Sequence, residues 1–398
     1  MHPASFSFHF PKLFPSRTRR ELKELMIATT IVDFGAATIM LFEPIFLWSL
    51  GYGLESILLF WVMVYGLYLV LMPCGAKFAA QYGNEPGIFV GTIFLVVYLA
   101  SLYLIQFVPH MIFIAPFIYA LQKAFYWPAF NADFAENVGR KAEGRLVSEL
   151  QIFISIVSVL GPVIGSGIVK IFGFGWFFAV MGLIMILSNW VTLRTREKNT
   201  PRSYAYFYAF KRIFSHERRR ELFAYLGFGE ELIMLGVWPV FLFVVVKDIF
   251  STGALASIAM FVTVVLLYIV GQMTDARNKV SVMRFGVIVQ AFSWIARMFV
   301  VTSFHAFLAD SFGRFAKSVA YVPLMAITYD NAKNHTIMHT MMFFETALAL
   351  GKFAAALLGL LILGLFPHTT SGFQIIFGLA GAMTLLYALL RREQSVQS

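Results

Sequence analysis

Carboxylate side chains recur inside long apolar stretches of this sequence, where the burial of a charge is energetically unfavourable and indicates a functional or structural role. A charged side chain at the centre of a bilayer costs at least about 2.5–3.5 kcal/mol. Asp33, Glu43, Glu230 and Glu231 are placed in this way. A buried carboxylate that meets water from alternate sides can bind and release a proton. These four residues are therefore candidates for proton coupling, and Asp33 is the first choice because no basic residue lies one helical turn away.

Two apolar stretches also carry charged and aromatic residues at helical spacing, so that each set lies on one face of a helix. The set in residues 305–329 is Asp310, Arg314, Lys317 and Tyr321. The set in residues 109–134 includes Tyr119, Lys123 and Tyr126. These seven residues are candidates for contact with a substrate. In the simpler alternative, Asp310 and Arg314 neutralise each other one turn apart, and Lys123 holds a carboxylate of the protein.

Other charged residues in apolar stretches are interpreted as structural or as parts of a gate. Glu345 and Lys352 lie two turns apart on one helical face and are interpreted as an ion pair. Glu149 and Glu345 each lie near the start of an apolar stretch, where a carboxylate meets a helix N-terminus, and both are gate candidates. Arg297 is interpreted as reaching toward the membrane surface.

The composition predicts that these residues lie on helices that cross a membrane. The chain of 398 residues is 59% hydrophobic and 13% charged, against about 25% charged for soluble domains. Apolar runs of about 20 residues recur along its whole length, and backbone groups in lipid must then be paired within helices. We predict an all-α polytopic membrane protein with about twelve spans. They are expected near 25–49, 55–75, 87–108, 109–134, 148–170, 173–193, 222–246, 252–273, 282–302, 305–329, 337–364 and 372–390.

The net charge of +10 is distributed by side of the membrane rather than as a patch for nucleic acid. With these spans, 24 of the 31 basic residues fall on one side, including nine between Arg194 and Arg220. A basic excess marks the cytoplasmic side. We therefore expect a multi-pass protein of the cell membrane with both termini in the cytoplasm.

The chain also repeats itself. Phe34-Gly35 recurs 194 positions later as Phe228-Gly229, and Pro44 to Leu47 recurs 195 positions later as Pro239 to Leu242. Such matches in order predict two similar halves. The expected organisation is two six-helix bundles with short flanking segments. Its parts are an N-terminal arm (1–24), a first bundle (25–193), a linker (194–221), a second bundle (222–390) and a tail (391–398).

Two local motifs, together with this organisation, resemble the major facilitator superfamily, whose halves are parallel repeats. Residues 271–279 resemble that family's loop between its second and third spans, with Gly271, Asp275 and Arg277 as the matching positions. The resemblance implies that these three residues help to close the cytoplasmic side. Residues 161–167, GPVIGSG, resemble an element associated with antiporters, and Gly161, Pro162 and Gly165 are expected to bend or pack that helix.

The resemblance implies a secondary transporter that works by alternating access. We expect proton-coupled export of a small organic compound, cationic or amphipathic. The alternatives are import of an anionic nutrient held by Lys123, Arg314 and Lys317, a membrane sensor, or an enzyme acting on lipid. No phosphate-cradling loop or nucleophile motif is present, so an ATP-driven pump and an enzyme are disfavoured. The expected partners are protons, the solute and the bilayer, without nucleic acid, and the chain is expected to act as a monomer without cofactor or metal ion.

Overall fold

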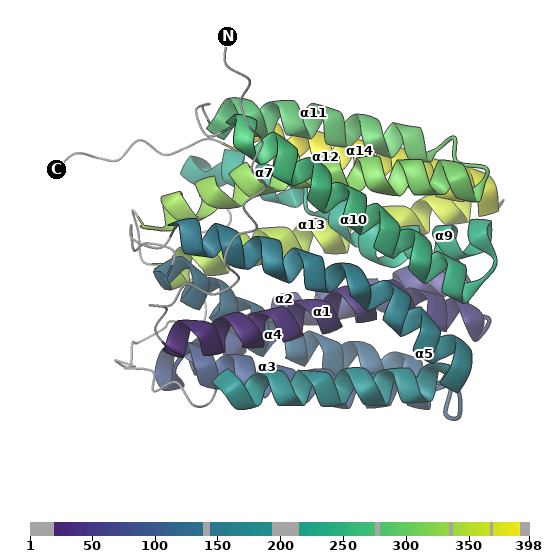
Figure 1. Cartoon of the computed structure of the whole chain (residues 1–398), viewed down its shortest axis with the longest axis horizontal. Helices are drawn as coiled ribbons and strands as arrows, with labels where there is room; N and C mark the ends of the chain where they lie inside the picture. The colour runs from purple at the N-terminus through teal and green to yellow at the C-terminus, as the bar shows by residue number, and fades with distance from the viewer. Residues whose placement is uncertain are drawn as a thin grey trace, which may run out of the picture.

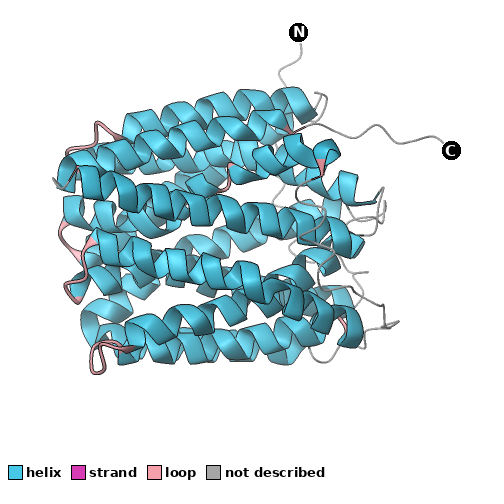
Figure 2. Cartoon of the chain, turned by 180° about the vertical axis from the view of Figure 1, so that it is seen from behind, coloured by secondary structure: helices cyan, strands magenta, loops and turns pink. Residues whose placement is uncertain are grey.

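The computed structural model describes residues 20–137, 144–192, 215–274, 279–333, 337–366 and 369–390. In these ranges the chain forms helices joined by short connections, with no strand (Figure 2). The helices of the first part are α1 (Arg20–Ser49), α2 (Leu54–Tyr82), α3 (Asn84–Leu104), α4 (Met111–Asn137) and α5 (Gly144–Thr192). Those of the second part are α7 (Arg219–Leu226), α8 (Gly229–Leu232), α9 (Trp238–Val246), α10 (Ile249–Thr274), α11 (Lys279–Arg297), α12 (Ser303–Lys333), α13 (Ile337–Leu365) and α14 (Thr369–Leu385).

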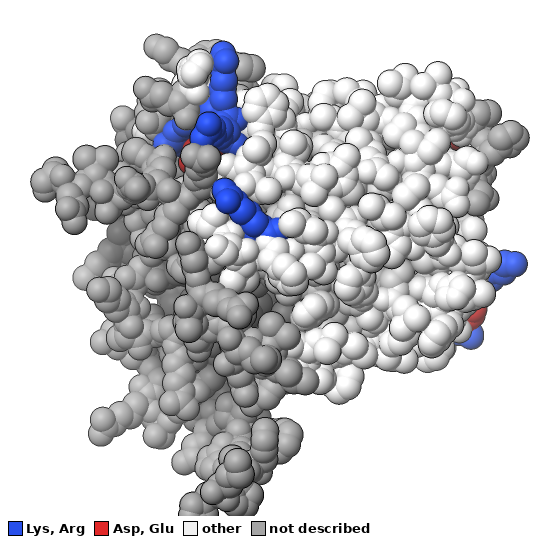
Figure 3. Space-filling model, turned by 90° about the horizontal axis from the view of Figure 1, so that it is seen from above, with Lys and Arg blue, Asp and Glu red and all other residues white. Residues whose placement is uncertain are grey.

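The helices lie roughly side by side along the longest axis of the molecule (Figure 1). Seven helical segments of the described part are long and apolar enough to cross a membrane. Figure 3 shows a broad band without charged side chains on one face, between charged groups at the two ends of the helices. Such a band is the surface that a hydrocarbon layer requires. The number of twelve spans stays a prediction.

Glycines with positive φ mark the two ends of the helical bundle. Gly83 (φ 112°) separates α2 from α3. Gly173 (φ 84°) is the point inside α5 where the backbone leaves the helical conformation, between the spans predicted at 148–170 and 173–193. Only glycine adopts this conformation without a steric penalty. We call the two ends of the bundle the Gly83 end and the Gly173 end.

The stretch that was predicted as one span at 222–246 contains a wider helical turn. Helices α8 and α9 are joined by a π-helical turn, Ile233–Val237. A π-helical turn holds one more residue than an α-helical turn. The offset of the sequence repeat grows from 194 to 195 between Leu235 and Pro239, which is within or next to this turn. The extra residue of the second copy is therefore accommodated by the π-helical turn.

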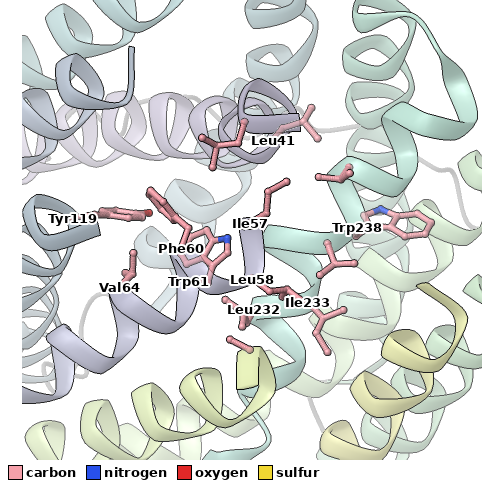
Figure 4. Close-up of a cluster of buried hydrophobic side chains, with 14 of the residues drawn as sticks. Leu41, Ile57, Leu58, Phe60, Trp61, Val64, Tyr119, Leu232, Ile233 and Trp238 are labelled. Atoms are coloured by element: carbon pink, nitrogen blue, oxygen red, sulfur yellow. The ribbon is translucent and has the colours of Figure 1, made fainter. Parts of the chain in front are cut away.

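Helices α1 to α5 pack mainly against one another, as do α7 to α14. The two groups meet where α5 packs against α10 and where α2 and α4 pack against α13. Between them lies an apolar contact in which Leu58 and Trp61 of α2 approach Leu232 and Ile233 (Figure 4). The predicted division into an arm, two bundles, a linker and a tail stays a prediction.

Candidate functional site

The two neighbouring glutamates of α8 have different environments because successive helical residues point about 100° apart. Glu230 is fully buried. Its carboxylate forms an ion pair with Lys317 of α12 and accepts hydrogen bonds from the indole of Trp294 (3.1 Å) and the hydroxyl of Tyr387 (3.2 Å). The amide of Gln290 donates a longer bond of 3.4 Å. The charge of Glu230 is therefore compensated by one cation and three neutral donors.

Glu231 lies close to two lysines, one on α13 and one on α12. Its carboxylate lies 2.6 Å from Nζ of Lys352 on α13 and 3.9 Å from Nζ of Lys317. Its side chain is 25% exposed, and that of Lys317 is 23% exposed. Lys317 thus lies between the two glutamates, and the four residues tie α8 to α12 and α13. Charges in a membrane interior are retained when they are paired in this way.

Asp310 forms a second charged cluster, toward the Gly173 end of α12. Its carboxylate accepts hydrogen bonds from Arg314 (2.8 Å) and from the indole of Trp238 (2.9 Å). Arg297 of α11 lies beside this cluster, with its guanidinium 4.8 Å from the ring of Trp238 and 4.2 Å from the ring of Trp294. Stacking on aromatic faces compensates a buried guanidinium.

The interpretation that Arg297 reaches toward the membrane surface is wrong, since this side chain is only 1% exposed. A side chain added at Gly313 would collide with its guanidinium, so α12 leaves room for Arg297 there. Two indole rings and the nearby Asp310 stabilise the charge inside the protein, and the side chain does not need to reach water.

Lys123 of α4 has an environment of aromatic rings. Its Nζ lies 4.2 Å from the ring centroid of Tyr119, 5.4 Å from that of Tyr65 and 6.0 Å from that of Trp61. The residue is 6% exposed. Among the described residues, no carboxylate lies within ion-pair distance of this ammonium. Its charge is balanced by ring faces and by carboxylates at longer range.

Glu43 of α1 is a buried carboxylate without an ion pair among the described residues. It is 2% exposed, and its Oε1 atom has no hydrogen-bond partner. The hydroxyl of Tyr98, which is close to this carboxylate, is also buried without a hydrogen bond of good geometry. The ring of Tyr98 stacks on that of Tyr119 at 4.1 Å, so this region adjoins Lys123. An unpaired buried carboxylate is unfavourable when charged and is favoured in its protonated form.

Glu345 joins the two groups of helices toward the Gly83 end. Its carboxylate accepts hydrogen bonds from the hydroxyl of Tyr68 on α2 (2.7 Å) and the amide of Asn131 on α4 (2.5 Å). Asn131 in turn accepts a bond from Tyr329 of α12 (3.0 Å). This network crosses from α13 and α12 to α2 and α4, and its bonds must break if the helices separate here.

The Gly173 end has its own contacts between the groups. The hydroxyl of Ser257 on α10 accepts a hydrogen bond from the backbone N–H of Val163 on α5 (3.0 Å). Lys170 lies 3.3 Å from Asp248, the residue before α10. The hydroxyl and then the backbone N–H of Ser251 donate hydrogen bonds to Asp248 and lower the pKa of its carboxyl from the usual value.

The motif GPVIGSG lies at a junction of three helices. A side chain added at Gly161 or Gly165 would collide with Thr38 or Phe42 of α1. On the other side, Gly253 of α10 leaves room for Pro162 and Ser166. The backbone of α5 keeps helical dihedral angles through this motif and leaves them at Gly173. The motif therefore supports close packing of α5 against α1 and α10.

Comparison with known proteins identifies the family. The model of the Major Facilitator Superfamily matches residues 25–251, more than half of the chain. The chain belongs to the Major Facilitator Superfamily. It is therefore a multi-pass membrane transporter rather than an enzyme. No curated protein sequence matches it.

Solved structures share the fold of this superfamily member at low sequence identity. A D-xylose-proton symporter is 13% identical with a TM-score of 0.68, over 95% of this chain and 99% of that chain. A structure described under substrate recognition in proton dependent oligopeptide transporters is 13% identical with a TM-score of 0.67, over 92% and 96%. A POT family transporter in complex with 5-aminolevulinic acid is 12% identical with a TM-score of 0.69, over 94% and 96%. At these identities the similarity shows the fold alone.

Several predicted site residues of this superfamily member have side chains outside the described part. Asp33 lies in α1, Glu149 in α5 and Gly271 in α10, and nothing is described of their surroundings. Asp275 and Arg277 lie outside the described residues altogether. Their predicted roles in proton coupling and in a cytoplasmic gate stay predictions.

Two predicted aromatic contacts with a substrate have different surroundings. Tyr321 is 36% exposed, and Nζ of Lys317 lies 5.4 Å from its ring centroid. Tyr126 is buried against Gly91 of α3 and stacks on Phe130 at 5.6 Å. Tyr321 is thus next to the Glu230–Lys317 pair, and Tyr126 packs within the first group of helices.

The proposed ion pair between Glu345 and Lys352 is wrong, because Lys352 binds Glu231 and Glu345 binds neutral donors. Partners from other helices approach each charge more closely than the residue two turns away. Sequence reasoning also missed the neutral donors around Glu230 and Glu345. A tyrosine or tryptophan in an apolar stretch is indistinguishable by sequence from a packing residue. These donors are Tyr68, Asn131, Gln290, Trp294 and Tyr387.

Proposed function

We propose that this chain is a proton-coupled secondary transporter of a small organic solute, with Glu43 as its proton-binding group. The observation that carries the proposal is the unpaired Oε1 atom of Glu43 in a fully packed region. A carboxyl group in such a place is neutral when buried and releases its proton when a conformational change brings water to it. Binding and release on opposite sides of the membrane couple the movement to the proton gradient.

Glu230, Glu231 and Asp310 are less suitable, since each already has an ion pair. Glu230 and Glu231 are paired with lysines, and Asp310 is paired with Arg314. The charge of each of these carboxylates is already compensated by a cation of the protein. Asp33, the first choice from the sequence, remains a second candidate.

Alternating access would use the contacts at the two ends of the bundle. We propose the predicted arrangement of twelve spans in two bundles, residues 25–193 and 222–390, with the Gly83 end in the cytoplasm. The bonds of Glu345 would open the cytoplasmic side when they break, and those of Val163 and Lys170 would open the other side. Rocking of one bundle on the other then exposes a central site to each side in turn.

Two directions of transport are compatible with this proposal. Export in exchange for protons is favoured by the GPVIGSG motif, which resembles an element associated with antiporters. Import together with protons is the second candidate. It is favoured by Lys123, a buried cation that has no acidic partner within the described part of the chain and would suit an anionic solute. The structural neighbours include a protein named as a proton symporter.

The test measures proton movement in proteoliposomes that contain a pH-sensitive dye. A panel of lipophilic cations and a panel of organic anions are added outside, one compound at a time, without a membrane potential. We expect at least one compound to move protons across the membrane with the wild-type protein. Inward substrate movement accompanied by internal acidification indicates symport, and internal alkalinisation indicates antiport.

The variant Glu43→Gln separates proton coupling from transport, and Glu55→Gln is its matched control. Glu55 is an exposed glutamate in the first turn of α2. Glu43→Gln should still exchange labelled substrate across the membrane but should not move protons, whereas Glu55→Gln should do both. Unchanged proton movement in Glu43→Gln would overturn the assignment of Glu43.

A further inference from the structure

Lys123 differs from Lys317, Lys352 and Arg314 in what surrounds it, and resembles Arg297, which also faces aromatic rings. Lys317 and Lys352 have glutamates within ion-pair distance, and Arg314 has Asp310. Lys123 has none, although it is as deeply buried as Lys352. Three aromatic rings face its ammonium instead. A cation that is removed from water without a counter-charge is an unfavourable arrangement unless a negative group reaches it during function.

The carboxylates around Lys123 act on it only at longer range. They are Glu43, Glu231 and Glu345, with the ammonium of Lys352 as an opposing positive charge. Glu231 and Glu345 already hold partners of their own. The ring centroid of Tyr65 lies 5.4 Å from Nζ of Lys123 and 5.6 Å from Nζ of Lys352. Two positive groups, one from α4 and one from α13, therefore approach the same aromatic side chain of α2.

We propose that Lys123, together with Lys352 near the same Tyr65 ring, binds the anionic group of the transported solute. This inference rests on the proposed transport function and names the substrate class. A carboxylate at this place would receive a charge-assisted hydrogen bond from Lys123 and attraction from Lys352. Because α4 and α13 belong to different groups of helices, the bound anion would contact both and would bias how they approach each other.

The surroundings of Lys123 also indicate the rest of the solute. The rings of Trp61, Tyr65 and Tyr119 provide apolar and aromatic surface around the ammonium. Such surface favours a flat or apolar body next to the carboxylate. The expected substrate class is therefore an organic monocarboxylate with an apolar or aromatic body. Since Lys123 is 6% exposed, the solute reaches it when the helices around it separate.

The test compares the binding of acids with that of their amides to detergent-purified protein, where no gradient is present. The probes are benzoate and phenylacetate beside benzamide and phenylacetamide, measured by isothermal titration calorimetry. We expect the wild-type protein to bind a carboxylate at least about tenfold more tightly than its amide, since a hydrogen bond to a charged group has about this strength. Lys123→Gln should abolish this preference, and Lys123→Arg should keep part of it.

Lys77→Gln is the matched control, because Lys77 is an exposed lysine on α2, and it should leave the preference unchanged. Binding of neither carboxylate to the wild type, or a preserved preference in Lys123→Gln, would overturn the proposal. Glu43→Gln distinguishes this result from the proton-coupling proposal. If it binds carboxylates normally and still moves protons, the role of Glu43 fails while the role of Lys123 stands.

Discussion

Lys123 of α4 and Lys317 of α12 lie 194 positions apart, one residue short of the offset of 195 that the sequence repeat has from Pro239 onward, and their surroundings differ. Lys317 lies between the carboxylates of Glu230 and Glu231. Lys123 lies among the rings of Tyr119, Tyr65 and Trp61. Two lysines at nearly matching positions of the repeat therefore have different kinds of partner.

The difference separates a charge that holds helices together from a charge that is available to a ligand. The partners of Lys317 come from α8, and the pair joins that short helix to α12. Removal of Lys317 leaves a buried carboxylate without its cation, whereas removal of Lys123 leaves no group within ion-pair distance uncompensated. The first lysine is therefore expected to matter for stability and the second for binding.

The largest expected effect is on stability and comes from Lys317→Met. Because Glu230 would stay buried and charged with neutral donors only, the free energy of unfolding should fall by about 3 kcal/mol or more. The same change at Lys123 removes a buried charge without breaking an ion pair and should cost less than about 1 kcal/mol or stabilise the protein. Denaturant unfolding in detergent micelles measures both values.

A second substitution shows whether the loss at Lys317 comes from its ion pair. In the Lys317→Met background, Glu230→Gln removes the uncompensated charge and should restore most of the lost stability. Equal losses in Lys317→Met and Lys123→Met, or no restoration by Glu230→Gln, would remove the distinction between the two lysines.

A smaller effect is expected from Lys352→Met. Glu231 is a quarter exposed and keeps Lys317 at 3.9 Å, so water and the remaining lysine compensate part of the lost interaction. The free energy of unfolding should fall by about 1 kcal/mol, less than for Lys317→Met, by the same unfolding measurement. A loss as large as that of Lys317→Met would mean that Glu231, rather than Glu230, carries the stability of this cluster.

The smallest effect is expected at the exposed pair of Lys170 and Asp248. The pKa of Asp248 is lowered in the folded protein by hydrogen bonds from Ser251. Its contribution is therefore present at neutral pH and is lost as the pH falls through this lowered value. Asp248→Asn should shift the melting temperature at neutral pH only slightly, and any shift should shrink at acid pH. A large shift that persists at acid pH would contradict this interpretation.

The sequence was sufficient for the class of fold and for the list of unusual charges, but not for their pairing. Long apolar runs predict membrane helices from composition alone, and each charge inside them is conspicuous. The partner of Glu231 is Lys352, 121 positions away. Such a contact depends on how helices from distant parts of the chain pack. The local spacing in the sequence favoured Glu345 as the partner of Lys352 instead.

Neutral partners are the second part of the site that the sequence does not reveal. Tyr68, Trp294 and Tyr387 compensate carboxylates, yet tyrosine and tryptophan are common in apolar helices for packing. The sequence also does not show which buried charged residue lacks an ion-pair partner. Only the packing of the surrounding helices shows that, among the residues that the structure describes, Glu43 has an unpaired oxygen and Lys123 has no carboxylate within ion-pair distance.

The most direct test of the central claim compares exchange with accumulation in proteoliposomes that contain Glu43→Gln. The solute is a compound that the wild type transports. We predict that the variant exchanges labelled for unlabelled solute at a rate close to that of the wild type and of Glu55→Gln, but that an imposed pH gradient no longer drives net movement of the solute against its own gradient. Net uphill movement equal to that of the wild type would contradict the account, because the coupling proton would then bind elsewhere.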